Sequence, residues 1–394
     1  MNKITAIINA KIVTVTRGNL ERGTILISDG KILEVGENIK VPEGAEIVNG
    51  EGYWVTPGLI DCHTHISTFS EPRNMPSLAT DANECSDPIT PYIRALDALN
   101  PFDPAVEKTR KAGFTTVYTG PGSGNLIGGT GISLKLRGKT AEEMIIPGTE
   151  QMKMALGENP KRAFGMDKKM PITRMGSAAL IRQALYDARN YADKLEKGKT
   201  DSTKAPEPNF KLDALVKVVR GEQRVRIHSH RSDDIRTAVR IAEEYKLDFS
   251  IEHATEGYLI KDFLASRNVT CVVGPLLLEP VKQEVWGLIL ENAGILTEAG
   301  VKVCLTADAG SKTAWLPVEI GLLIRRGLSE EAAFKGVTIY PAELLGIADR
   351  VGSIEVGKDA DLAVFDGHPF SNLSLCRATI IDGKFEYNTM QTHA

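Results

Sequence analysis

Histidines and one aspartate follow short apolar runs of the sequence, in positions that suit metal binding. These residues are His63, His65, His228, His253 and Asp308. His63 and His65 are two positions apart, so on an extended strand their side chains point to the same side and can share a metal. Imidazole nitrogen and carboxylate oxygen are ligands of Zn²⁺, and also of Mn²⁺, Fe²⁺ and Co²⁺. With His230, five of the seven histidines stand at such positions, which is improbable by chance, so we expect a metal site.

A β/α barrel would bring these scattered residues together. Apolar runs predict eight strands, at 55–60, 114–119, 132–136, 150–156, 224–227, 248–251, 270–274 and 302–306. Amphipathic stretches predict helices at 178–197, 234–246, 259–267 and 317–327. Alternating strands and helices are typical of a parallel sheet, and a TIM-type (β/α)8 barrel gathers its active site at the carboxyl ends of the strands. The third run, ISLKL, has an alternative reading as a hairpin outside the barrel.

The two ends of the chain share another pattern. Residues 1–55 and 351–394 contain short β segments joined by turn signals such as Asp29-Gly30 and Asp382-Gly383. We therefore expect both termini to form one small β-sandwich domain, with the barrel, residues 56–350, inserted between its two parts.

Composition limits the class of protein. The 394 residues are 42% hydrophobic and carry a net charge of −4, which favours neither nucleic acid nor an anionic membrane as a partner. We see no signal-peptide pattern and no apolar stretch near the roughly 20 residues that span a bilayer. The five cysteines are odd in number and lack Cys-x-x-Cys spacing, which favours a reducing cytoplasm. We expect a cytoplasmic protein acting on a small molecule.

Several motifs resemble one family. VTPGLIDCHTH (55–65) is similar to the first-strand signature of the amidohydrolase superfamily, and the likeness continues through IHSH, SIEHA, LTAD and GSIEVGKDADLAVFDG. It covers nearly the whole chain and is closest to the imidazolonepropionase-like branch, which includes prolidase-like dipeptidases. The resemblance implies His63 and His65 as first-strand metal ligands, and His228, His253 and Asp308 as ligands from the fifth, sixth and eighth strands.

Lys153 decides how many metals to expect. In EQMKMAL (150–156) it shares a face with Gln151 and Ala155, and an ammonium facing the barrel interior is costly without a partner. Dipeptidases of the superfamily carboxylate a lysine at the matching strand with CO₂, which makes it an anionic bridge between two metals. Imidazolonepropionases lack this lysine and bind one metal. An outward-pointing Lys153, or one paired with Glu150, is the alternative.

Three further residues are candidates for contact with substrate. His230 shares a face with His228 and could polarise a carbonyl, which makes it a catalytic candidate. Arg231 could clamp a carboxylate bidentately. Tyr258 follows His253 closely enough to reach the substrate. Each residue also has an alternative role. His230 could support the metal ligands, Arg231 could form a surface ion pair, and Tyr258 could pack in the core or at the surface.

Two loops are expected to border the site. The glycine-rich segment 120–130 could cradle an anion with its backbone N–H groups, although a flexible loop that edges the pocket is the favoured reading. Residues 67–104 are rich in Pro, Asp and Asn and are a candidate lid.

The resemblance implies hydrolysis of an amide-type C–N bond by metal-activated water, with one or two Zn²⁺ ions and Asp308 moving the proton. A dipeptide or N-acyl amino acid is favoured as substrate by Lys153 and Arg231. A cyclic amide, as in imidazolonepropionase, is the first alternative. It is disfavoured because that branch carries an acidic residue where this chain has Ser229, His230 and Arg231. Deamination of a heterocycle is a weaker variant of the same chemistry. A non-catalytic barrel scaffold is an alternative of a different class, and it is disfavoured because such scaffolds usually lose ligands and this chain has lost none that we see. Family analogy also implies a homo-oligomer.

Overall fold

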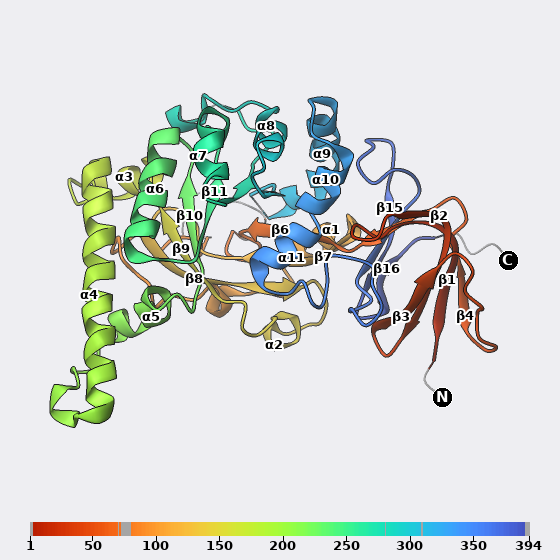
Figure 1. Cartoon of the computed structure of the whole chain (residues 1–394), viewed down its shortest axis with the longest axis horizontal. Helices are drawn as coiled ribbons and strands as arrows, with labels where there is room; N and C mark the ends of the chain where they lie inside the picture. Colours follow the sequence, from red (N-terminus) through yellow and green to blue (C-terminus); the bar gives the residue numbers. More distant parts are fainter. Residues whose placement is uncertain (1–2, 70, 72–79, 280, 309, 391–394) are drawn as a thin grey trace.

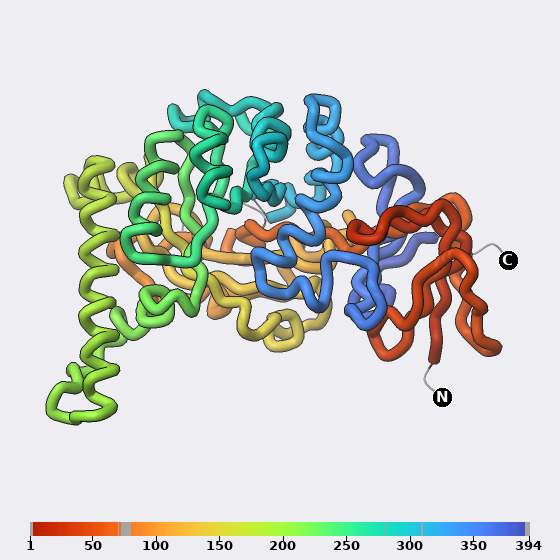
Figure 2. The backbone as a smooth tube through the Cα atoms, viewed as in Figure 1, coloured from red at the N-terminus to blue at the C-terminus, as the bar shows by residue number. Residues whose placement is uncertain are grey.

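The computed structural model describes residues 3–69, 71, 80–279, 281–308 and 310–390. Their strands form two eight-stranded sheets. One sheet combines strands from both termini and lies at one end of the molecule, where the N- and C-termini are also found (Figures 1 and 2). The other sheet makes the barrel, which is surrounded by helices (Figure 1).

The terminal sheet joins the beginning and the end of the chain. Its strands are β1 (Thr5–Val13), β2 (Asn19–Ser28), β3 (Lys31–Gly36), β4 (Glu46–Asn49), β5 (Trp54–Pro57), β14 (Leu362–Phe365), β15 (Cys376–Ile381) and β16 (Lys384–Asn388). β5 pairs antiparallel with β14, so the two ends share one sheet. Alternating apolar residues of β1 and β2 form its core; among them are Ile7, Ile12, Ile25 and Ile27. The two-layered sandwich stays a prediction.

The barrel sheet follows the order of the chain. Its strands are β6 (Leu59–Thr64), β7 (Phe114–Thr119), β8 (Ile127–Lys135), β9 (Gln151–Ala155), β10 (Val225–Ser229), β11 (Phe249–His253), β12 (Thr270–Val273) and β13 (Val303–Leu305). β6 and β7 are parallel, as are all the neighbours from β9 to β13. Seven of the eight predicted apolar runs each correspond to one of these strands, whereas the run 55–60 covers most of β5 and only the beginning of β6.

The third strand departs from the (β/α)8 prediction. β8 runs antiparallel to both β7 and β9, so a uniform eightfold β/α repeat is wrong, as is a hairpin outside the barrel. Only residues 120–126 separate β7 from β8. A parallel connection needs a crossover of about a dozen residues or more, so this short segment can only reverse the chain.

The first and last barrel strands are joined by side chains. The Thr306 hydroxyl, after β13, lies 2.7 Å from both the Asp61 carboxylate and the His63 carbonyl oxygen of β6. Asp61 also accepts hydrogen bonds from the Thr313 hydroxyl and the Ala307 backbone N–H. Burial raises the pKa of Asp61 to about 6, although these hydrogen bonds oppose the rise. The barrel is therefore nearly closed at the end where the predicted ligands lie.

Helices cover the outside of the barrel (Figure 1). They are α1 (Pro104–Lys111), α2 (Ala141–Met144), α3 (Glu158–Gly165), α4 (Arg174–Thr200), α5 (Phe210–Val219), α6 (Ser232–Tyr245), α7 (Lys261–Ala265), α8 (Asn292–Glu298), α9 (Leu316–Arg325), α10 (Glu330–Gly336) and α11 (Ile339–Leu345). In α6 the buried residues Ile235, Ala238, Val239 and Ala242 recur at helical spacing and face the barrel. Among the described residues, no helix has the length and apolar character needed to cross a bilayer.

A buried charge cluster connects the two sheets. Lys135, at the end of β8, is 1% exposed and donates to Asp359 (2.7 Å), Asp361 (3.1 Å) and Asp382. Lys31 and Arg350 also pair with Asp359. We call Lys135 and its three aspartates the Lys135 cluster. Two of the aspartates belong to the segment GKDADLAVFDG, whose acidic residues therefore hold the terminal sheet against the barrel.

Candidate metal centre and active site

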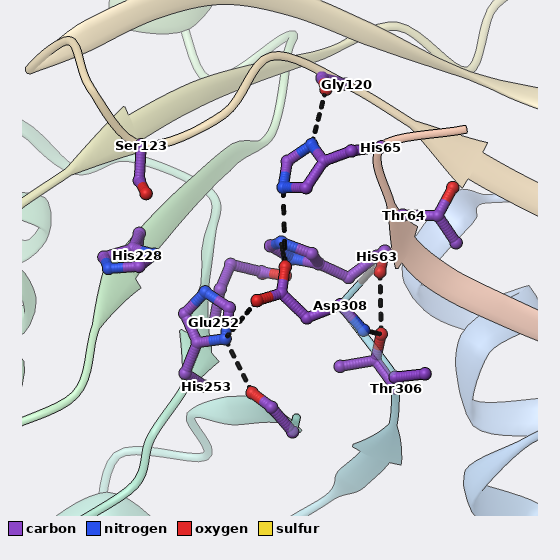
Figure 3. Close-up of polar contacts among 12 residues, drawn as sticks. His63, Thr64, His65, Gly120, Ser123, His228, Glu252, His253, Thr306 and Asp308 are labelled. Atoms are coloured by element: carbon purple, nitrogen blue, oxygen red, sulfur yellow. Dashed lines mark hydrogen bonds and ion pairs between the residues drawn. The ribbon is translucent and has the colours of Figure 1, made fainter. Parts of the chain in front are cut away.

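The predicted ligands meet at the carboxyl ends of the barrel strands (Figure 3). Asp308 Oδ1 lies 3.3 Å from His63 Nε2 and 3.4 Å from His65 Nε2. Asp308 Oδ2 lies 3.9 Å from His253 Nδ1. Side chains from β6, β11 and the segment after β13 thus converge on one carboxylate, as the barrel prediction requires.

The ligand atoms form two adjacent groups. His63, His65 and Asp308 make one, His228, His230 and His253 make the other, and within each the atoms lie within 4.8 Å of one another. The groups adjoin, because the ring centroids of His63 and His253 are 4.9 Å apart. The cluster therefore has the donors for one cation in each group.

Four of the imidazoles are anchored through Nδ1, and each has a different partner. The partner atoms are Glu252 Oε2 for His63 (2.5 Å), the Gly120 carbonyl for His65 (2.8 Å), the Gly274 carbonyl for His253 (2.6 Å) and the Thr255 hydroxyl for His230 (2.7 Å). Carboxylate and carbonyl acceptors place the proton on Nδ1 of His63, His65 and His253. Their Nε2 atoms are then free to bind a cation, which is the usual arrangement of metal-binding histidines.

His228 supplies an independent test of whether a cation fits. Its Nε2 atom is buried and has no hydrogen-bond partner among the described residues. Such an orphaned nitrogen is costly unless something binds it. Burial lowers the pKa of His228 well below the usual value and that of His253 to about 3. Both rings are therefore neutral, the form that binds a metal.

Asp308 stays anionic in this cluster. Burial alone would raise its pKa, but the neighbouring imidazoles of His253, His63 and His65 outweigh burial and hold the pKa well below the usual value. Asp308 and His253 have φ angles of 52° and 73°, in the left-handed region that non-glycine residues seldom adopt. Backbone strain of this kind is frequent at functional sites.

Lys153 faces the barrel interior. It lies on β9, is 3% exposed, and its Nζ atom is 3.3 Å from His63 Nε2. Burial lowers the pKa of Lys153 to about 8, against the opposing influence of Glu252 and Asp308. The alternative of an outward-pointing lysine is wrong.

A buried ion pair between Glu252 and Arg226 lies beside His63. Glu252 receives two hydrogen bonds from Arg226, at 3.1 and 2.6 Å, and one from the Ser250 hydroxyl. Although burial alone would raise the Glu252 pKa, Arg226 and His63 hold it well below the usual value. Sequence reasoning did not identify Glu252 as a site residue. The available signal was a charge within each of the neighbouring apolar strands VRIH and SIEH, since such charges need partners.

A cavity of about 450 Å³ opens beside the cluster. His65, His228, His230 and Asp308 line it, as do three cations that sequence reasoning missed, namely Arg162, Lys282 and Lys312. Arg162 lies on α3, Lys282 in a loop and Lys312 in a short 3-10 helix (Ser311–Trp315), and no periodicity marks any of them.

The glycine-rich loop borders this cavity, as the favoured reading predicted. Gly122, Ser123 and Gly124 are among the lining residues. The Gly122 N–H donates to the Ala82 carbonyl and the Gly124 N–H to Asn83 Oδ1, so these two N–H groups are not available to bind an anion. Phe69, Asn83 and Cys85 bring part of the 67–104 segment to the cavity. Residues 70 and 72–79 lie outside the described part of the chain, and the lid stays a prediction.

The three predicted substrate contacts differ in outcome. His230 lines the cavity, with its Nε2 atom 3.2 Å from Lys282 Nζ. Arg231 is absent from the cavity lining, because its guanidinium pairs with Asp233 two positions along the chain, at 2.9 and 3.1 Å. Tyr258 does not line the cavity either; its backbone N–H donates to Asn292. This geometry does not support Arg231 or Tyr258 as substrate contacts.

Comparisons with known proteins agree with this fold. A model of the amidohydrolase family matches residues 281–392. The crystal structure of an amidohydrolase from Thermotoga maritima MSB8 is 40% identical, covers 98% of this chain and 100% of that one, and has a TM-score of 0.93. A prolidase solved with N-methylphosphonate-L-proline covers 98% of this chain and 100% of its own at 19% identity and a TM-score of 0.62, which shows a shared fold.

Two sequence relatives extend the comparison. The amidohydrolase tasK of Hapsidospora irregularis is 28% identical over 93% of this chain, which spans 40% of the length of tasK. An imidazolonepropionase of Mesorhizobium japonicum is 25% identical over 89% of this chain and 87% of its own length.

Proposed function

The chain belongs to the amidohydrolase family and is a hydrolase of carbon–nitrogen bonds; from this premise we propose that it is metal-dependent and cleaves a dipeptide or an N-acyl amino acid. Residues 56–350 would carry the reaction, and the two terminal parts, 1–55 and 351–394, would support the barrel.

The observation that carries the proposal is the orientation of the imidazoles. His63, His65 and His253 are held through Nδ1, and the Nε2 atom of His228 has no hydrogen-bond partner among the described residues. His63, His65 and Asp308 would hold one cation, and His228 and His253 a second. Bound Zn²⁺, or another divalent transition metal, would acidify a water molecule and polarise the substrate carbonyl.

Residues of the chain would then transfer the proton from water to the leaving group. Asp308 is anionic and lies on the cavity wall, so a carboxylate oxygen can accept a proton from water and deliver it to the leaving nitrogen. His230 lies on the same wall and would contact the substrate beside the metal centre.

Lys153 would determine the number of metals. Carboxylation by CO₂ would replace its ammonium with an anionic ligand next to His63. A two-metal site of the dipeptidase type would follow. Without carboxylation the ammonium repels a cation and favours a single metal.

Opening of a cyclic amide is the second candidate. It is supported by the similarity to imidazolonepropionase along most of both chains. The cations that line the cavity are compatible with both kinds of substrate, since both can carry a carboxylate.

Elemental analysis of the purified protein, combined with hydrolysis of a dipeptide and N-acyl amino acid library, tests the proposal. Two metals per chain with amide hydrolysis support the dipeptidase type, and one metal with cyclic-amide hydrolysis supports the alternative. A metal content near zero, with no hydrolysis after metal is added, would refute both. His228→Asn should lower the metal content, whereas His368→Asn, an imidazole outside the cavity lining, should leave it unchanged.

A further inference from the structure

Two cationic side chains converge on one amide oxygen in the wall of the cavity. Arg162 Nη2 and Lys282 Nζ each lie 3.4 Å from Asn159 Oδ1. Arg162 and Asn159 belong to α3, whereas Lys282 comes from the segment after β12. Two cations that share one acceptor atom repel each other, and an anion bound near both offsets this repulsion. The arrangement therefore favours a negatively charged group in the cavity.

The structure neutralises only one of these charges. Lys282 pairs with Glu284 at 2.5 Å, and Glu284 is held in turn by the Glu158 backbone N–H at 2.8 Å. No ion pair of Arg162 is found in the part of the chain that the structure describes. Lys312, the third cation of the lining, donates to the Leu277 carbonyl and lies 3.4 Å from Glu319. Arg162 is thus the cation of the lining that lacks an acidic partner.

The amide that joins the two cations is fixed in place. Asn159 Nδ2 donates to the Ser123 hydroxyl at 2.8 Å, which leaves Oδ1 directed at Arg162 and Lys282. Ser123, drawn beside His228 in Figure 3, lines the same cavity. The acidic residue of the lining is Asp308, at the metal centre. The cavity consequently has a cationic wall and a hydrolytic centre within one volume of about 450 Å³.

We propose that Arg162, supported by Lys282 and Asn159, is the receptor for a free carboxylate of the substrate. A guanidinium can bind a carboxylate with two parallel hydrogen bonds. The inference rests on the proposed function: the substrate would be an acyl compound with a carboxylate at the end that faces α3. It also assigns to Arg162 the clamp that the sequence had suggested for Arg231.

Kinetics with matched substrate pairs test the receptor. Each N-acetyl amino acid would be compared with its carboxamide, which lacks the negative charge. Arg162→Gln should raise KM for the acids about tenfold to a hundredfold and leave the carboxamides nearly unchanged. Arg162 is exposed on α3, so this change should not disturb folding. Arg240→Gln is the matched control, because Arg240 is also an exposed helical arginine bonded to a side chain three positions earlier.

Calorimetric titration with the same N-acetyl amino acids gives a readout that does not require turnover. The metal-loaded wild-type protein should bind the acids more tightly than the carboxamides, and Arg162→Gln should abolish the difference. Two results would overturn the receptor. One is an equal affinity of the wild type for acids and carboxamides; the other is a preference for acids that Arg231→Gln abolishes and Arg162→Gln leaves intact. If the binding difference is found but no amide is cleaved, the receptor stands and the hydrolytic assignment fails. If carboxamides are cleaved as well as acids, the hydrolase stands and the receptor fails.

Discussion

His63 Nδ1 and Glu252 Oε2 lie 2.5 Å apart, which links the candidate metal centre directly to a buried ion pair. Glu252 stays charged because Arg226 donates to both of its oxygens. A carboxylate that accepts the Nδ1 proton fixes the ring orientation and increases the basicity of Nε2. Glu252 thus prepares His63 for a cation without itself being a candidate ligand.

We predict that Glu252→Gln weakens metal binding about 10- to 100-fold, because a neutral amide increases the basicity of His63 less. Competition with a chelator measures this affinity. The substitution also leaves Arg226 buried without its carboxylate, which costs about 3–5 kcal/mol. The double variant Glu252→Gln/Arg226→Met removes this second effect. It should recover stability but not affinity, and an unchanged affinity in a folded variant contradicts the role of Glu252.

Asp308→Asn should lower kcat about 10²- to 10⁴-fold, since an amide cannot take up the proton. Elemental analysis of the same preparation should still show metal, held by the imidazoles. Asp233→Asn, at an acid paired with Arg231, is the control and should retain activity. Full turnover by Asp308→Asn would exclude Asp308 as the proton carrier.

For Lys153→Met we expect the metal content to fall from two per chain to one, because the carboxylated ligand is lost. Labelling the wild type with ¹³C bicarbonate should give a carbamate signal that the variant lacks. Lys302→Met, at an exposed lysine paired with Glu343, should change neither result. Identical metal contents in wild type and Lys153→Met would rule out a bridging lysine.

Without metal, the protein should become less stable as the pH falls from about 7 to about 4.5. Burial lowers the pKa of His65, His228 and His230, and that of His253 to about 3, whereas in the unfolded chain these rings titrate near 6.5. Between these values the unfolded chain binds more protons, so acid favours unfolding, by up to about 1.4 kcal/mol per pH unit for each ring. Asp61, with its raised pKa of about 6, opposes this trend, as do buried carboxyls such as Asp234 and Glu319, whose pKa values are also raised by burial.

Urea unfolding of the metal-free protein at several pH values measures the slope of stability against pH. His253→Asn should make the slope shallower, because it removes one of the groups that resist protonation. A stability that is constant or rises on acidification would show that the rings are not held neutral.

The Lys135 cluster should matter for stability and not for catalysis. Lys135→Met leaves its three aspartates without their shared cation, and we expect a loss of about 3–5 kcal/mol in the free energy of unfolding. Lys111→Met, at an exposed lysine of α1, is the control and should have little effect. A loss no larger than that of the control would mean that the charges are dispensable.

The positions of the candidate metal ligands could be predicted because they depend on a general rule. His63, His228, His253 and Asp308 follow apolar runs, and a barrel brings the carboxyl ends of such strands together. The direction of β8 could not be read in the same way, because an apolar run has the same pattern in either direction. Its orientation depends on the short connection at 120–126, which leaves no room for a crossover.

The cavity wall was harder to predict because contacts with the rest of the fold decide it. Arg231 adjoins the histidines in sequence, but Asp233 holds its guanidinium away from the cavity. Arg162 and Lys282 lie 120 positions apart in the chain and meet only through Asn159. Glu252 was within reach of prediction, since a lone acid in a buried strand implies a partner on a neighbouring strand.

The terminal sheet also constrains how the protein is made. Lys31 pairs with Asp359, which follows it by 328 positions, and β5 completes its pairing only with β14. On the ribosome, the first strands emerge long before these partners are synthesised. Their apolar residues and the unpaired edge of β5 must stay exposed to chaperones, or to other nascent chains, until the segment that contains β14 has been translated.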